Sequence, residues 1–187
     1  MIQNNYADNR ADKEQGWYLL ADSAVTNTGK PFYQPEGLGK VSVSLCPAVR
    51  MARLGKSISP KFASRYYSEL APALHFRLPQ YWQQLQEANL STDAAVNFDR
   101  SLFVGDALEL TRFEELILLL NGKEKSKWEI TKLRKSIDQI LSEISMLNTI
   151  KMGDMILPGL CEEIDIKEGD LIEVILNGEL SFKVKVK

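Results

Sequence analysis

The chain has 187 residues, of which 44% are hydrophobic, and its 23 basic and 25 acidic side chains leave a formal net charge of −2. A chain of this length can bury a substantial core without disulfides, so we expect a single domain over residues 1–187. Neither sign of charge is concentrated in a tail, which argues against a nucleic-acid partner.

The sequence also argues against a membrane protein. Residues 1–5 contain neither a basic nor an apolar signal segment, and no apolar run approaches the roughly 18 residues that a membrane helix needs. Cys46 and Cys161 have neither the number nor the spacing of a disulfide framework or a zinc site. We therefore expect a soluble, cytoplasmic protein with two buried free thiols and no membrane partner.

Two short strands are predicted in the first quarter of the chain. They cover residues 17–20 and 40–45, and a Gly/Pro-rich loop from Thr28 to Gly39 separates them. In the second strand, apolar residues alternate with polar ones at Val41, Val43 and Leu45. The alternation predicts one buried face.

Two helix starts follow. Ser59 is a capping hydroxyl and Pro60 suits the first helical position, which predicts a helix over residues 61–70. The Leu78-Pro79 pair predicts a second helix that reaches Glu87.

The second half of the chain predicts a hairpin, a helix and two more strands. Asn121-Gly122 is a strong turn signal between residues 116–120 and 128–130. A helix is predicted over residues 131–147, with an apolar stripe at Leu133, Ile137, Ile140, Leu141 and Ile144. Strands associated with Gly-Asp turns are expected within 150–159 and 166–174. These elements predict an α+β domain with a curved, largely antiparallel sheet and two or three helices.

Several short motifs, taken in order, resemble the fumarylacetoacetate hydrolase family. They are Asn5-Tyr6-Ala7, Arg53-Leu54-Gly55-Lys56, Asn97-Phe98-Asp99, Lys151-Met152-Gly153-Asp154, Gly159 and Gly169-Asp170. The resemblance implies a mixed β-sandwich roll, commonly assembled as a homodimer. It also implies enzymes that use Mg²⁺ or another divalent ion to cleave, decarboxylate or tautomerise a 2-oxo or 1,3-diketo acid.

The metal ligands of that family are replaced in this chain. The family's Glu-x-Glu pair falls at Ser44 and Cys46, and its Asp falls at His75. A hard divalent cation needs several oxygen ligands, whereas a thiol and an imidazole suit softer transition metals. We interpret the three side chains as a strand serine, a small buried thiol and a core histidine. The alternative is an altered transition-metal site.

The family's catalytic positions are replaced as well. Its general base and the acidic residue that orients it fall at Asn9 and Asp12, and its lysine falls at Val96. An asparagine cannot shuttle a proton near neutral pH, and a valine cannot stabilise developing negative charge. The Gly-Thr-Pro turn of the family is Gly159-Leu160-Cys161 here, without a hydroxyl.

Two hypotheses follow from these substitutions. The first is an inactive family member, a pseudoenzyme without a cofactor. It would serve as a structural partner or bind a small organic acid in a pocket lined by Cys46, His75, Gly159 and Leu160. The second is a divergent metal-dependent hydrolase, isomerase or decarboxylase of 2-oxo or 1,3-diketo acids, with a site rebuilt around Cys46, His75 and Asp12.

Overall fold

The computed structural model describes residues 2–4, 17–129, 131 and 135–187. Its larger sheet contains β1 (Ile2–Asn4), β2 (Trp17–Leu19), β3 (Val25–Asn27), β4 (Val41–Met51), β5 (Tyr67–Arg77), β6 (Leu102–Val104), β7 (Leu108–Glu109), β10 (Met155–Leu157) and β11 (Ile164–Ile166). The smaller sheet contains β8 (Glu115–Leu120), β9 (Lys123–Glu129), β12 (Leu171–Leu176) and β13 (Glu179–Lys185). The helices are α1 (Pro60–Ala63), α2 (Pro79–Glu87) and α3 (Ile137–Leu147), and 3₁₀ turns lie at Asp22–Ala24, Asp93–Ala95 and Leu110–Arg112.

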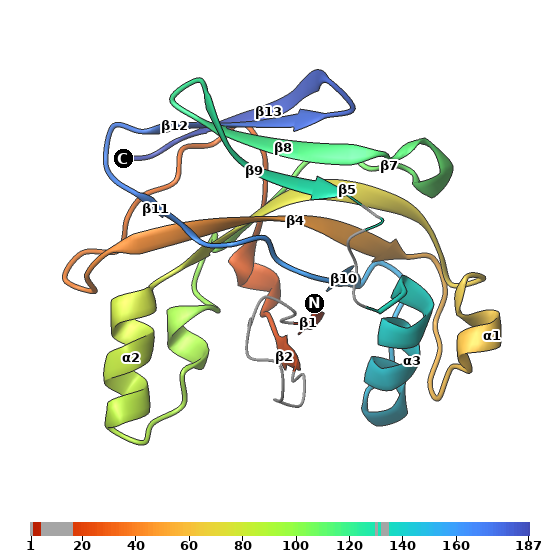
Figure 1. Ribbon diagram of the computed structural model, residues 1–187. Coiled ribbons are helices and arrows are strands. Elements are labelled where there is room, and N and C mark those ends of the chain that lie inside the picture. Colours follow the sequence, from red (N-terminus) through yellow and green to blue (C-terminus); the bar gives the residue numbers. More distant parts are fainter. Residues whose placement is uncertain (1, 5–16, 130, 132–134) are drawn as a thin grey trace.

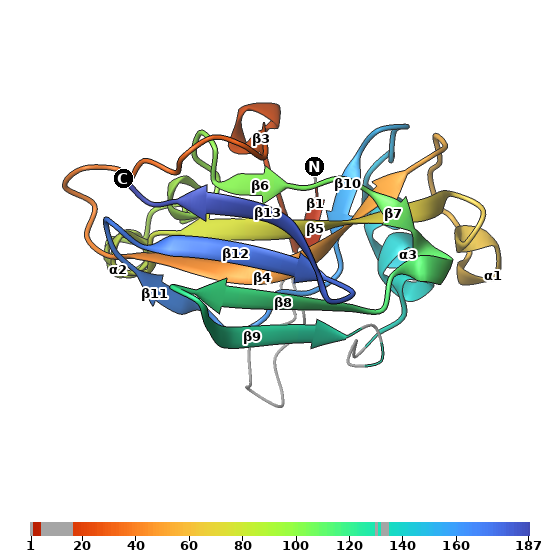
Figure 2. The same cartoon turned by 90° about the horizontal axis from the view of Figure 1, so that it is seen from above.

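The two sheets form a sandwich. The nine-stranded sheet has the order β2-β1-β10-β4-β5-β6-β3, with β11 on β4 and β7 on β5, and the four-stranded sheet has the order β13-β12-β8-β9. Figure 1 shows the four-stranded sheet on one side of the larger sheet and the three helices on the other, and Figure 2 shows the smaller sheet from above. Apart from two parallel pairs, β1 with β10 and β3 with β6, the strands named here pair antiparallel. This arrangement confirms the predicted α+β class.

Strands β4 and β5 form the centre of the molecule, and both of their faces are buried. Val43 and Leu45 belong to the core between the sheets, together with Leu118 and Val174 of the smaller sheet. On the opposite face of β4, a second and smaller cluster of buried side chains includes Cys46 and Ala48. Because successive side chains of a strand point to opposite faces, the predicted alternation of β4 describes only one of its two buried faces.

The structure corrects the predicted helix over residues 61–70. Helix α1 ends at Ala63, and β5 begins at Tyr67. From Tyr67 to Arg77, β5 pairs with β4 along nearly its whole length. This ladder satisfies the backbone hydrogen bonds and buries most of the side chains, so the tertiary context overrides the local helix signal.

Helix α3 begins later than predicted, at Ile137 rather than Thr131. Ser136 and Gln139 form a capping box, in which the Ser136 hydroxyl accepts from the Gln139 N–H at 3.3 Å and the Gln139 side chain accepts from the Ser136 N–H at 3.0 Å. Such a cap satisfies two otherwise unpaired donors and defines the first turn. Ile137, Ile140, Leu141 and Ile144 of the predicted stripe are buried, whereas Leu133 lies outside the described residues.

Three turns were predicted correctly. Asn121 and Gly122 have φ of 52° and 76° and join β8 to β9, as a tight hairpin turn requires. In the two Gly-Asp turns, Asp154 and Asp170 accept backbone N–H bonds from Lys151 at 2.7 Å and Lys167 at 3.0 Å.

None of the helices in the described parts of the chain has the length and apolarity to cross a membrane. The predicted cytoplasmic location stays a prediction. Cys46 and Cys161 form no disulfide, as predicted, but only Cys46 is fully buried, and Cys161 is partly exposed.

Candidate functional site

The register of β4 and β5 brings together Ser44, Cys46 and His75, the three positions at which the family resemblance predicts substituted metal ligands. Ser44 lies directly opposite His75, and Cys46 lies opposite Ala73 on the next same-face pair. Ser44, Cys46 and His75 are all completely buried. The three side chains therefore share one sheet face, on the side of β4 that is turned away from the smaller sheet.

Both ring nitrogens of His75 have protein partners. Nε2 lies 2.9 Å from the carbonyl oxygen of Val96, and Arg77 Nε donates to Nδ1 at 3.3 Å. Since a carbonyl oxygen only accepts, Nε2 carries the proton and Nδ1 is the acceptor. Burial, followed by the charge of Arg77, lowers the pKa of His75 to about 3. The imidazole is therefore neutral and has no nitrogen lone pair free for a metal.

Arg77 is the centre of a hydrogen-bonded group that we call the Arg77 network, formed by Arg77, His75, Glu163, Tyr18 and Ser42. Arg77 Nη1 donates to Glu163 Oε1 at 2.9 Å, and Nη2 donates to the Tyr18 hydroxyl at 3.2 Å. The Ser42 hydroxyl donates to the second Glu163 oxygen at 2.5 Å. The network joins β2, β4, β5 and the segment before β11, so a positively charged group links four parts of the chain at this position.

Burial controls the chemistry of the remaining groups. It raises the pKa of the Tyr18 phenol to about 12, so this group stays protonated. Burial also raises the pKa of the Cys46 thiol far above its usual range, and the thiol donates to the Ala73 carbonyl at 3.7 Å. A protonated thiol is a poor nucleophile and a poor metal ligand. The Ser44 hydroxyl oxygen is buried without a hydrogen-bond partner in the described structure.

The other predicted site residues have varied positions. Val96 is nearly buried, and its backbone carbonyl oxygen is the hydrogen-bond partner of His75 Nε2. Leu160 packs in the same apolar cluster as Cys46. Gly159 is buried beside Leu160. Asn9 and Asp12 lie outside the described residues. That Cys46, His75, Gly159 and Leu160 line a ligand pocket stays a prediction.

Four members of the Arg77 network were not predicted from the sequence: Arg77, Glu163, Tyr18 and Ser42. The acidic run around Glu163 is typical of an exposed loop, yet Glu163 is the carboxylate partner of Arg77. One signal was present, because Arg77 follows His75 by two residues on a strand and therefore shares its face. An arginine on a buried face requires an acidic partner, although the sequence does not say which one.

Comparisons with known proteins identify relatives over the whole chain. The mitochondrial oxaloacetate tautomerase of Bos taurus is 26% identical over 198 residues, covering 100% of this chain and 90% of that protein. A 4-hydroxyphenylacetate degradation bifunctional isomerase/decarboxylase of Escherichia coli is 23% identical, covering 87% of this chain but 37% of that protein. No protein-family model matches the chain.

Solved structures show the same fold. A protein of Yersinia pestis that is assigned to the fumarylacetoacetate hydrolase family superposes with a TM-score of 0.89 at 20% identity, covering 100% of this chain and 91% of that one. The fumarylpyruvate hydrolase of Pseudomonas aeruginosa, in complex with Mn²⁺ and pyruvate, superposes with a TM-score of 0.87 at 17% identity, covering 99% of this chain and 87% of that one. Together with the sequence relatives, these matches show that the chain has the fold of the fumarylacetoacetate hydrolase family and is similar in sequence to known proteins over its whole length.

The fumarylpyruvate hydrolase structure holds Mn²⁺, but the described residues of this chain do not fit such an ion. In the described parts of the chain, no three His, Cys, Asp or Glu side chains are grouped so that they could hold a metal. Ser44 and Cys46 present neutral groups, and the Arg77 guanidinium contacts the third position, His75. A divalent cation here would face a fixed positive charge without several carboxylates to offset it.

His75 should make the stability of the protein depend on pH. The histidine titrates near pH 6.5 when exposed but near 3 in the fold. Below pH 6.5, therefore, the unfolded chain binds a proton that the folded chain does not. We expect this to lower the free energy of unfolding by about 1.4 kcal/mol per pH unit as the pH falls from 6.5 toward 3.

Urea unfolding at a series of pH values, from neutral to about pH 4, measures this effect. His75→Gln is the matched control, because an amide can donate and accept at similar positions but does not titrate. His75 is the only histidine of the chain, so no other imidazole contributes to the difference. Equal pH slopes for the two proteins would contradict the assignment of a neutral, buried His75.

Proposed function

We propose that the protein is an inactive member of the fumarylacetoacetate hydrolase family, with a structural or ligand-binding role in place of metal-dependent catalysis. The observation that carries the proposal is the Arg77 network. A guanidinium donates to His75, which stands where the family resemblance predicts a metal carboxylate, so a fixed positive charge lies beside that position. Electrostatic repulsion and the neutral groups at Ser44 and Cys46 both oppose metal binding.

Loss of the metal would remove the main source of transition-state stabilisation in this chemistry. A bound divalent ion polarises the substrate oxygen and stabilises the enolate that forms. None of the Arg77 network groups can replace it, because Arg77 is already bonded to Glu163, Tyr18 and His75. In the same network, His75 cannot act as a general base while its only lone pair accepts from Arg77.

A metal titration tests the proposal. We expect the thermal unfolding temperature to stay unchanged in millimolar Mg²⁺ or Mn²⁺, compared with NaCl at matched ionic strength. A ligand that binds only the folded state would raise the unfolding temperature, by an amount equivalent to about 2.7 kcal/mol at a hundredfold excess over Kd. A saturable rise with Mn²⁺ would contradict the proposal.

The names of the relatives support a second candidate function, in which the protein is a divergent enzyme. The curated relatives compared here carry names of enzymes that tautomerise, isomerise or decarboxylate their substrates. An assay of oxaloacetate tautomerisation with and without Mn²⁺, followed by ultraviolet absorbance, separates the two functions. If the protein is inactive, oxaloacetate tautomerises in its presence at the same rate as in buffer without protein. A metal-dependent rate that His75→Gln abolishes would favour the enzyme.

The predicted homodimer belongs to the proposal in either case, and light scattering measures it.

A further inference from the structure

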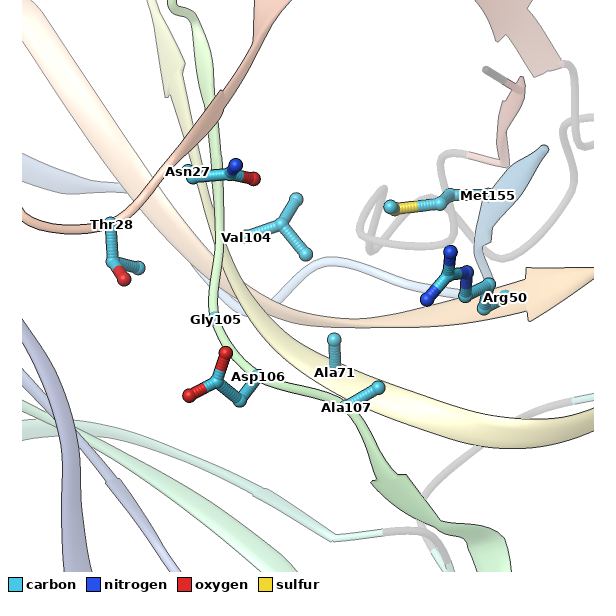
Figure 3. A pocket seen from close by; sticks show the side chains of 9 residues that line it. All are labelled: Asn27, Thr28, Arg50, Ala71, Val104, Gly105, Asp106, Ala107 and Met155. Carbon is cyan, nitrogen blue, oxygen red and sulfur yellow. The ribbon is translucent and has the colours of Figure 1, made fainter. Parts of the chain in front are cut away.

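A concavity lies on the face of the larger sheet that carries the Arg77 network, farther along β4. It has a volume of 340 Å³ and is formed by β3, β4, β5, β6, β10 and the segment after β6 (Figure 3). Its floor is apolar and includes Ala71, Val104 and Met155, and its rim is polar and includes Asn27, Arg50 and Asp106. We call it the Arg50 cleft. Its volume lies at the small end of the range for ligand pockets.

The strands that build the cleft keep its centre open. Ala48 and Ala71 form a cross-strand pair of β4 and β5, so small side chains occupy this part of the face. Two residues beyond Ala48, Arg50 lies on the same face and pairs with Met155 of β10. The β4–β5 ladder shifts register between Arg50 and Met51. Register shifts and bulges of this kind change the direction of side chains and interrupt regular strand pairing, and they are frequent next to binding sites.

Gly105 determines the position of the side of the cleft that carries Asp106. A Cβ at this position would lie 2.9 Å from a ring carbon of Phe182 and 3.0 Å from the Pro72 side chain, so only glycine allows this close approach. The Gly105 N–H also donates to the Pro72 carbonyl at 2.9 Å. The backbone that carries Asp106 is therefore held against β5 and β13.

The cleft carries two opposite charges that are not paired with each other. In Figure 3, Arg50 and Asp106 lie on opposite sides of the Ala71 methyl group, and the Asp106 carboxylate is turned away from Arg50. Within the described ranges, neither side chain takes part in an ion pair or a side-chain hydrogen bond. The cross-strand neighbour of Arg50 is Glu69, and no ion pair joins these two described residues.

We propose that the Arg50 cleft binds a small zwitterion, with its carboxylate at Arg50, its ammonium group at Asp106 and a short aliphatic body over the apolar floor. A guanidinium can bind a carboxylate through two parallel hydrogen bonds, and a carboxylate accepts from an ammonium group. Ala71, Val104 and Met155 offer contact to methylene groups between the two charges. This assignment is independent of any activity at the Arg77 network.

A series of ω-amino acids tests the proposal on the full chain. The probes are glycine, β-alanine, 4-aminobutyrate, 5-aminopentanoate and 6-aminohexanoate, with butyrate and butylamine as single-charge controls. Binding is followed by ligand-observed nuclear magnetic resonance and by calorimetry. We expect one chain length to bind best, about fivefold more tightly than either control, because it alone reaches both charges.

Two variants assign the binding to the cleft. Arg50→Gln and Asp106→Asn should each weaken the best zwitterion about fivefold and leave the single-charge compound that does not use the changed group unaffected. Arg53→Gln, at an exposed arginine outside the cleft lining, is the matched control and should change nothing. Circular dichroism confirms that each variant is folded. The absence of binding at every chain length, or binding that neither cleft variant weakens, would overturn the proposal.

Discussion

Replacing Arg77 with methionine is expected to lower the free energy of unfolding by about 3 kcal/mol. The change leaves the Glu163 carboxylate without its ion-pair partner and the buried His75 Nδ1 without its donor. Removal of one partner of a buried charge pair typically costs about 3–5 kcal/mol. We take the lower end because the side chain of Glu163 is 39% exposed, whereas that of Arg77 is 10% exposed. Urea unfolding measures the difference.

Glu163→Gln is the control for the Arg77 substitution. It keeps the shape of the side chain and a hydrogen-bond acceptor, and it changes a group that reaches solvent, so we expect a loss of about 1 kcal/mol. The double variant Arg77→Met/Glu163→Leu should recover part of the loss, because no unpaired carboxylate remains. If Arg77→Met were as stable as the natural protein, the network would have no structural importance, and our account of the site would fail.

The second large effect concerns restoration of the family's metal ligands. The variant Ser44→Glu/Cys46→Glu/His75→Asp places three carboxylates at buried positions of one sheet face. Without metal, we expect it to be largely unfolded, because burying several unpaired carboxylates costs more than the roughly 5–15 kcal/mol that stabilises a domain. With Mg²⁺ or Mn²⁺, we expect folding to return, because the ion neutralises the carboxylates in the folded state only.

The measurement is thermal unfolding across a metal titration. Adding Arg77→Met to the variant removes the competing guanidinium, so this protein should respond at a lower metal concentration. Ser44→Glu/His75→Asp changes only one cross-strand pair and provides a milder variant if the larger set does not fold. Variants that fold but do not respond to metal would contradict the idea that the strand framework of the metal site persists.

Short-range features of the fold were predictable from sequence. The Asn121-Gly122 hairpin and the apolar stripe of α3 depend on residues within a few positions of each other, and the structure confirms both. The helix predicted over residues 61–70 was wrong because β5 is stabilised by its ladder with β4, which joins residues such as His75 and Ser44 across the intervening chain. A local pattern carries no information about such a distant partner.

The candidate site, like the fold, has features that residue types reveal and features that depend on tertiary contacts. The absence of carboxylates at Ser44, Cys46 and His75 could be read from the sequence, because it needed only the residue types at three positions. The contacts of Arg77 beside them could not. Arg77 and Glu163 lie 86 positions apart, and only the packing of the segment before β11 against β5 brings them together.

Residue identity by itself determined the family resemblance, the α+β class and the absence of carboxylates at Ser44, Cys46 and His75. The tertiary structure decided the protonation state of His75, the partner of Arg77 and the existence of the Arg50 cleft. The physical reason is that charge type belongs to single residues, whereas burial, pairing and cavities arise only when strands from distant parts of the chain share a face.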